Sequence, residues 1–138
     1  MKTTDQKITI QCHTITIRPR YAETDQGGVV HHSVFPIWFE MGRTELLRIN
    51  GLDYACMEKE GTFFVVAELQ IKFRSPARYD DPLTLETSCG RVTASRVEHT
   101  YRLTRPKTGI LIAEGSSILA CVDRQGKLQR VPEFMIPA

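Results

Sequence analysis

The sequence lacks the features that mark several large classes of protein. Its 138 residues contain no long uninterrupted run of apolar side chains, whereas a membrane span needs about 20 of them. Residues 1–10 alternate between polar and apolar types and do not form the apolar core of a secretory signal. We therefore expect a cytoplasmic protein with no membrane span.

Charge of one sign is not concentrated anywhere along the chain. The formal net charge is +2, and the basic residues are scattered. Nucleic-acid-binding domains instead gather lysine and arginine on one face. Nucleic acid is therefore not an expected partner.

The four cysteines, Cys12, Cys56, Cys89 and Cys121, are far apart. None belongs to a CxxC pair of the kind that zinc knuckles and redox dithiols use. The neighbouring histidines His31 and His32 lack the HxxxH or carboxylate spacing of a metal centre. We expect no metal, and reduced, mostly buried thiols.

The chain also lacks repeats, low-complexity stretches and a linker rich in proline, glycine or serine. Its length and its 41% hydrophobic content lie in the range where one domain buries a sufficient core. A single domain over residues 1–138 is expected.

One long helix is predicted between Ser33 and Asn50, because apolar residues recur there every three or four positions. Ser33 is the expected N-cap and Gly51 the expected C-terminal stop. Pro36 falls in the first turn, where its missing N–H breaks no bond. Gly42 inside the helix indicates close packing on something flat.

The remaining segments have the composition of strands. Residues 8–21 predict one strand with a bulge or two short strands, and residues 63–73 predict a long strand whose dry face meets the helix. Three more strands are predicted at 83–91, 96–105 and 109–122, and their short connections imply antiparallel hairpins. This order predicts an α+β hotdog fold, an antiparallel sheet of about five strands wrapped around one long central helix.

The chemistry-bearing residues lie between the first strand and the helix. Asp25 is followed by Gly27 and Gly28, which permit close approaches that a Cβ would forbid. Free N–H groups at the helix start offer an oxyanion a positive electrostatic end. Such a site suits a thioester, because a thiol with a pKa of about 8.5 leaves almost without a general acid. The carboxylate could activate water or attack the carbonyl itself.

This segment resembles the 4-hydroxybenzoyl-CoA thioesterase family, and in detail the branch with the Tol-Pal-associated acyl-CoA thioesterases. The resemblance lies in a spaced set of residues, Asp25, Gly28, Val30, His32, Phe35, Trp38, Phe39 and Glu40. Residues 73–83 resemble the exit of the family's second strand, so the match extends from about Thr16 onward. The resemblance implies an acyl-CoA thioesterase in which CoA is part of the substrate and no cofactor is needed.

The resemblance also implies the roles of particular residues. It makes Asp25 the catalytic general base or nucleophile, within the turn that contains Gly28. It assigns the carbonyl-polarising backbone N–H to His32. His31 stands where many relatives carry an aromatic residue, so the acyl pocket is expected to differ there.

Substrate contacts are implied as well, in two further segments. Residues Phe64, Val65 and Val66 are expected against the acyl or pantetheine arm, and Thr93, Ser95 and Arg96 near CoA. The family builds its active sites between two subunits, which implies a homodimer or homotetramer.

Alternatives remain open at this point. Asp25 could be an ordinary turn aspartate, and Glu40 either a second catalytic carboxylate or a surface or ion-paired residue near Arg43 or Thr44. Arg74, Arg78, Arg91 and Arg96 could attract CoA phosphates or be solvated. The fold could instead serve an acyl-thioester hydratase or dehydratase, or a non-catalytic acyl-CoA-binding module. The acyl group cannot be read from the sequence.

Overall fold

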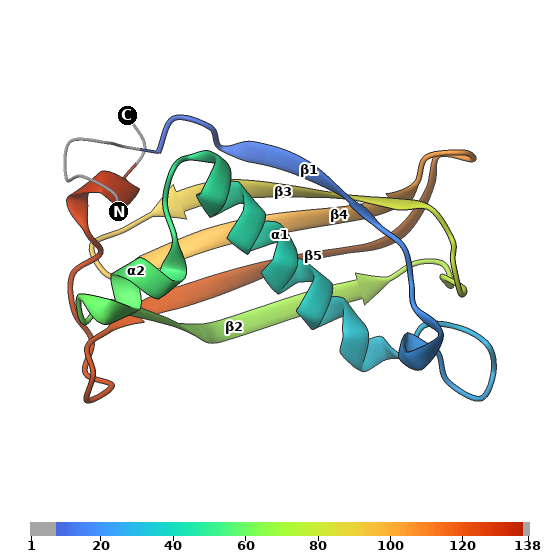
Figure 1. The fold of residues 1–138 in the computed structure, drawn as a ribbon, viewed down its shortest axis with the longest axis horizontal. Helices are drawn as coiled ribbons and strands as arrows, with labels where there is room; N and C mark the ends of the chain where they lie inside the picture. The colour runs from blue at the N-terminus through green and yellow to red at the C-terminus, as the bar shows by residue number, and fades with distance from the viewer. Residues whose placement is uncertain (1–7, 137–138) are drawn as a thin grey trace.

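The computed structural model describes residues 8–136 and has the predicted hotdog architecture. Five antiparallel strands follow the order β1-β3-β4-β5-β2, and α1 lies across one face of the sheet (Figure 1). The elements are β1 (Cys12–Ile17), the 3-10 turns η1 (Tyr21–Glu23) and η2 (His32–Val34), α1 (Phe35–Ile49), α2 (Tyr54–Lys59), β2 (Phe63–Phe73), β3 (Leu83–Val92), β4 (Arg96–Arg105), β5 (Ile110–Val122) and the 3-10 turn η3 (Glu133–Met135).

Two glycines let α1 lie close to the sheet. A Cβ on Gly42 of α1 would collide with the Thr87 hydroxyl of β3. On the sheet side, a Cβ on Gly115 of β5 would come within 2.8 Å of the Phe39 ring. Real Cβ atoms do not make such approaches because interiors are already close-packed. The prediction that Gly42 packs on a flat surface is therefore confirmed.

The two ends of α1 match the sequence differently. Ser33 is not its N-cap, because η2 precedes the helix and the ring of His31 accepts the Ser33 N–H through Nδ1 (3.2 Å). At the other end, Gly51 has a positive φ of 78° and donates its N–H to the Arg48 carbonyl (2.9 Å). This is a left-handed helix ending, as predicted for Gly51.

Two local predictions were wrong. The first strand covers only Cys12–Ile17, in unbroken register with β3, and contains no bulge. The short helix α2 was not predicted, because six residues are too few for a helical period to stand out. Asp53 caps α2 by accepting the Ala55 N–H (2.9 Å).

The core consists of two apolar clusters along α1. The first surrounds Phe35, Trp38 and Phe39 at the N-terminal half of the helix, and the second surrounds Leu46 and Leu47 at its C-terminal half. Buried polar groups separate them: Arg43 Nη1 donates to the Tyr101 hydroxyl (3.2 Å), which lies 2.5 Å from Ser117 Oγ.

Burial favours the neutral forms of His99 and Tyr54, which lie near this polar layer. It lowers the pKa of His99 to about 3, with a further contribution from the Arg43 charge. It raises the pKa of Tyr54 to about 12. Both groups are therefore uncharged at neutral pH, and a buried neutral ring such as His99 is no general base for an exposed substrate.

The cysteines are free thiols, as expected, but only Cys89 and Cys121 are buried. Burial raises the pKa of both of these thiols. Cys12 is exposed and Cys56 half-buried, so the expectation of mostly buried thiols holds for two of the four. No helix in residues 8–136 is long and apolar enough to cross a membrane.

Strand β2 forms one edge of the sheet and pairs only with β5. Its bounds agree with the prediction, but α1 covers its dry face only in part. Val65, Val66, Leu69 and Phe73 remain between 42% and 53% exposed. A long apolar edge strand presents unpaired backbone groups that natural proteins usually cover.

Candidate active site

The segment that joins β1 to α1 folds into a tight hairpin. The Asp25 N–H donates to the Val29 carbonyl (2.8 Å), and the His31 N–H donates to the Glu23 carbonyl (2.9 Å). At the tip, Gly28 has a φ of 83°, a conformation that glycine adopts without cost. The hairpin thus fixes Asp25, Gly28, His31 and His32 in one unit.

Asp25 does serve the turn, but with only one of its two oxygens. Its Oδ1 accepts the N–H groups of Gly27 (2.9 Å) and Val29 (3.3 Å). A Cβ on Gly27 would stand 3.3 Å from that oxygen, so a glycine suits this position. Oδ2 makes no hydrogen bond to any group in residues 8–136, and the residue is exposed. The turn therefore orients the carboxylate and leaves one oxygen available.

His32 opens the 3-10 turn η2, which leads directly into α1. The N–H of the next residue, Ser33, is taken by His31 Nδ1, whereas the His32 N–H donates to nothing within the described chain. Such a donor at the positive end of a helix is suited to an oxyanion. His31 therefore caps the turn with its side chain. Its imidazole ring also stacks on that of His32, with the centroids 4.3 Å apart.

The second sequence motif lies against this hairpin. The Val30 N–H donates to the Ala77 carbonyl (2.8 Å), and Val29 forms a bridge with Arg78. Two segments far apart in the sequence therefore form one wall. Beside it is a cavity of about 290 Å³, lined by Val30, His32, Phe35, Phe73, Arg74, Ser75, Pro76 and Ala77.

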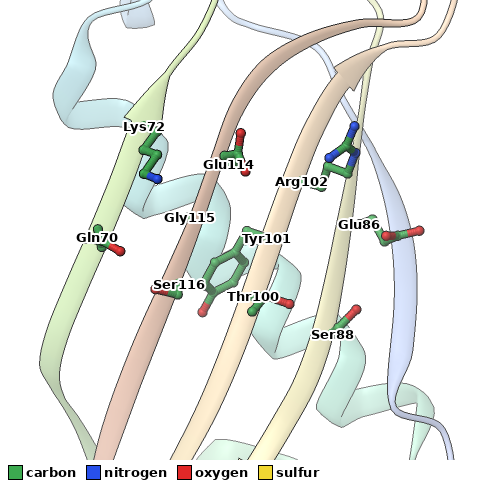
Figure 2. Close-up of a pocket in the computed structure, with 10 residues that line it drawn as sticks. All are labelled: Gln70, Lys72, Glu86, Ser88, Thr100, Tyr101, Arg102, Glu114, Gly115 and Ser116. Atoms are coloured by element: carbon green, nitrogen blue, oxygen red, sulfur yellow. The ribbon is translucent and has the colours of Figure 1, made fainter.

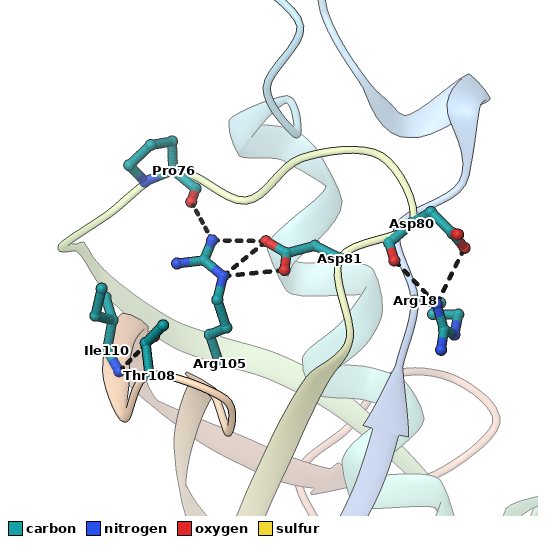
Figure 3. Close-up of polar contacts among 7 residues, drawn as sticks. All are labelled: Arg18, Pro76, Asp80, Asp81, Arg105, Thr108 and Ile110. Carbon is teal, nitrogen blue, oxygen red and sulfur yellow. Dashed lines mark hydrogen bonds and ion pairs between the residues drawn. The ribbon is translucent and has the colours of Figure 1, made fainter.

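A bidentate ion pair holds the loop that follows β2. Arg105 donates to both carboxylate oxygens of Asp81, with distances of 2.6 and 2.9 Å, and to the Pro76 carbonyl (3.1 Å) (Figure 3). The hydrogen bond from Arg105 holds the pKa of Asp81 below its usual value. Since Pro76 and Ala77 line the cavity, this pair fixes one of its walls.

A buried carboxylate fastens the hairpin to α1. Glu23 accepts the Arg20 N–H through Oε1 (2.7 Å) and the indole N–H of Trp38 through Oε2 (3.3 Å). The sequence analysis assigned no role to Glu23, Asp81 or Arg105. Asp81 lies in the second segment that resembles the family, and this resemblance could have drawn attention to it. Its partner Arg105 is known only from the fold.

Apart from His31, which lies in the hairpin, the expected substrate-binding residues are at the other end of the molecule. Phe64 packs on Tyr54 of α2 (ring centroids 6.1 Å apart), and Ser95 accepts the Cys121 N–H (2.9 Å) in the turn between β3 and β4. Along β2, Val66 is seven residues from Phe73, or about 23 Å in an extended strand. One chain therefore does not bring Phe64, Val65, Val66, Thr93, Ser95 or Arg96 to Asp25 (Figure 1).

Of the other candidate side chains, Arg74 lines the cavity beside His32, whereas Glu40 does not join the site. Glu40 is exposed on α1, in agreement with the surface alternative, and Arg43 is not its partner because Arg43 is buried and donates to Tyr101. Arg74 forms an ion pair with Glu114 (3.0 Å). Residues 8–136 contain no cluster of three or more side chains that could hold a metal ion.

An oriented carboxylate, a backbone donor at a helix start and an adjacent cavity are features that transfer of an acyl group to water requires. Comparison with known proteins gives the same class. A model of the Thioesterase-like superfamily matches residues 19–138. The chain therefore belongs to this superfamily and is a thioester hydrolase.

Individual relatives match most of the chain. An acyl-CoA thioesterase of Haemophilus influenzae, YbgC, is 34% identical over 116 residues, which cover 83% of each chain. The crystal structure of a DHNA-CoA thioesterase from Staphylococcus aureus has a TM-score of 0.82 at 30% identity and covers 86% of this chain and 80% of that one. A Thermus thermophilus structure has a TM-score of 0.80 at 39% identity, over 87% and 91%.

Proposed function

We propose that this chain hydrolyses small acyl-CoA or aroyl-CoA thioesters, with Asp25 as the catalytic carboxylate and the His32 N–H as the oxyanion donor. The observation that carries the proposal is the different use of the two Asp25 oxygens: Oδ1 accepts the N–H groups of Gly27 and Val29, and Oδ2 has no hydrogen-bond partner in residues 8–136. The names of the relatives, acyl-CoA thioesterases among them, support CoA as the leaving group.

The Asp25 carboxylate and the His32 N–H have different tasks in the reaction. The thioester carbonyl accepts a hydrogen bond from the His32 N–H, which stabilises the charge that develops on its oxygen. Asp25 either takes a proton from an attacking water or attacks the carbonyl carbon itself, giving an anhydride that water then cleaves. CoA leaves as a thiolate in both cases. The cavity of about 290 Å³ beside His32 would hold the acyl group.

The complete site, in this proposal, needs two copies of the chain. If the exposed edges of β2 pair antiparallel around a two-fold axis near Glu68, residues 64–66 of one copy lie opposite residues 70–72 of the other. Phe64, Val65 and Val66 then approach the second copy's cavity, next to Phe73. Thr93, Ser95 and Arg96, at the same end of the sheet, move closer as well. Light scattering of an active sample at micromolar concentration tests this, and the mass of one chain would exclude it.

The test of the function combines a panel of acyl-CoA esters with colorimetric detection of the released thiol. Asp25→Asn keeps an oxygen for the turn but removes basicity and nucleophilicity, so kcat should fall about a hundredfold or more. Asp53→Asn, at the cap of α2, is the matched control and should keep wild-type kcat.

Two results would contradict the proposal. An Asp25→Asn variant with more than about a tenth of wild-type kcat would move the catalytic role elsewhere. Hydration of crotonyl-CoA without release of thiol would replace hydrolysis by the hydratase reaction. Thermal melts of each variant establish that it is folded.

A further inference from the structure

Glu23 is a buried carboxylate that the proposed reaction does not use. Its side chain is only 10% exposed, and a carboxylate is rarely buried unless hydrogen bonds hold it. Its ion-pair partner within residues 8–136 is Arg20, whose side chain is 76% exposed, so solvent screens that attraction. The other contacts of Glu23 therefore have to explain why the carboxylate lies inside the protein.

Those contacts join three segments of the chain at one residue. Oε1 accepts the backbone N–H of Arg20 (2.7 Å), which follows β1, and Oε2 accepts the indole N–H of Trp38 (3.3 Å), on α1. The backbone carbonyl of Glu23 accepts the His31 N–H (2.9 Å) from the returning arm of the hairpin. The strand, the hairpin and the helix thus meet at Glu23.

Trp38 gives this junction a fixed anchor. It is only 2% exposed, and its ring packs edge-on against the Phe35 ring, with the centroids 5.2 Å apart. A close-packed interior leaves such a ring little freedom to move, and a buried indole N–H needs an acceptor. Within the described chain, the acceptor is the Glu23 carboxylate.

The junction sets where the proposed catalytic groups stand relative to the acyl cavity. Glu23 closes the base of the hairpin that contains Asp25, and Trp38 belongs to the helix whose Phe35 lines the cavity. The reacting carboxylate has to meet the carbonyl of an acyl group held in that cavity. A misplacement of about 1 Å at a reacting group can cost about a hundredfold in rate.

We propose that Glu23 and Trp38 are positioning residues, whose hydrogen bond holds the Asp25 hairpin in place against the acyl cavity on α1. The inference rests on the proposed function and adds to it a contact that touches no substrate. Loss of this contact lowers kcat, because Asp25 then approaches the carbonyl less accurately. It leaves KM nearly unchanged, because the groups that bind the substrate are all retained.

Two variants and their combination test the hydrogen bond itself. Trp38→Phe removes the indole N–H but keeps an aromatic ring in the core, and kcat should fall about tenfold. Glu23→Gln leaves one acceptor oxygen for two donors, Arg20 and Trp38, and should lower kcat at least as far. In the double variant that oxygen can serve Arg20 alone. Its kcat should therefore be no lower than that of Glu23→Gln, whereas independent effects would multiply.

Tyr101→Phe is the matched control, because it also removes one buried hydrogen-bonding group and keeps an aromatic ring. Tyr101 lies in the middle of β4 (Figure 2), and its hydroxyl accepts a hydrogen bond from Arg43 Nη1 (3.2 Å). Thermal melts should show lower stability for both Tyr101→Phe and Trp38→Phe, but Tyr101→Phe should keep wild-type kcat. Amide hydrogen exchange at His31, which reports on its bond to Glu23, should become faster in Trp38→Phe and not in Tyr101→Phe.

Three results would overturn the proposal. Wild-type kcat in folded Trp38→Phe and Glu23→Gln would show that the contact positions nothing. Equal losses of kcat in Trp38→Phe and Tyr101→Phe would assign the effect to general destabilisation, and multiplied losses in the double variant would show that the two residues act separately. A wild-type protein that releases no thiol would refute the proposed function instead, since exchange at His31 is measured without substrate.

Discussion

The two halves of α1 are held in different ways. Both halves are buried in apolar clusters, but directed polar contacts also surround the N-terminal half and the candidate site: Glu23 to Trp38, Asp25 to its own turn, and Arg105 to Asp81. The C-terminal half is buried among apolar side chains such as Leu46 and Leu47, together with α2 and the segment at Val131–Met135. Arg43 and Tyr101 mark the boundary between the halves.

The difference follows from what each end must do. Hydrogen bonds fix orientation, which a reacting carboxylate and an oxyanion donor need to within fractions of an ångström. Apolar burial is not directional but supplies most of the free energy of folding. A change in the C-terminal apolar cluster should therefore alter stability alone, whereas a change in the polar contacts around the candidate site should also alter turnover.

The largest effect is expected for Leu46→Ala in the C-terminal half. Leu46 is buried, and truncation of a buried leucine costs about 2 to 5 kcal/mol of the free energy of unfolding. Urea or thermal unfolding measures the loss, whereas kcat of the folded fraction should stay at the wild-type value. Ile49→Ala, partly exposed on the same helix, serves as the milder control. A large fall in kcat for folded Leu46→Ala would break the separation of the halves.

The second prediction concerns the backbone donor at His32. His32→Pro removes the N–H, and the preceding residue His31 already has extended angles of φ −65° and ψ 140°, which a following proline requires. Loss of one oxyanion donor costs about a hundred- to a thousandfold in kcat. His32→Ala keeps the N–H and should lose less than about tenfold. Circular dichroism and melts establish folding, and a folded, active Pro variant beside an inactive Ala variant would refute the assignment.

The sequence predicted much of this arrangement because the responsible interactions are local. The period of α1, the helix stop at Gly51, the strand 63–73 and the Asp25 turn all depend on neighbouring residues. Gly42 was informative for the same reason, since a glycine inside a helix needs an explanation. The family resemblance then supplied roles for residues whose pattern alone left several alternatives open.

What the sequence could not predict depends on distant partners. In the sequence, Glu23 has the pattern of an ordinary turn residue. Only the fold shows that it accepts the indole N–H of Trp38. Asp81 and Arg105 are 24 residues apart and meet only through the sheet. Helix spacing left an ion pair of Glu40 with Arg43 open, but Arg43 is buried and donates to Tyr101. The residues that we expected to bind substrate lie far from Asp25 in one chain, and in the proposed function they reach the site only in a second copy.

The smallest effect is expected for the ion pair that fixes the cavity wall. Asp81→Asn should lower the free energy of unfolding by about 1 kcal/mol at pH 7, the upper part of the range for ion pairs near a surface. The matched control is Asp80→Asn, because the Asp80–Arg18 pair is longer (3.3 Å) and its side chains are 60% and 57% exposed. Those of Asp81 and Arg105 are only 13% and 21% exposed. The control should change stability much less.

The pH dependence of this stability difference tests whether the ionised Asp81 carboxylate is its cause. Because the hydrogen bond from Arg105 lowers the pKa of Asp81 in the folded protein, the pair contributes stability above the unfolded pKa of about 3.9 and loses it as the pH falls through the folded value. The difference between wild type and Asp81→Asn should thus be constant from pH 7 to about 5 and shrink below that. Asp81→Asn should also have a lower kcat/KM, because Arg105 loses the carboxylate that orients it and then holds the Pro76 carbonyl less firmly at the cavity. Asp80→Asn should keep full activity. A stability difference that persists unchanged into acid would assign the effect to packing, and the ion pair would then have no part in holding the wall.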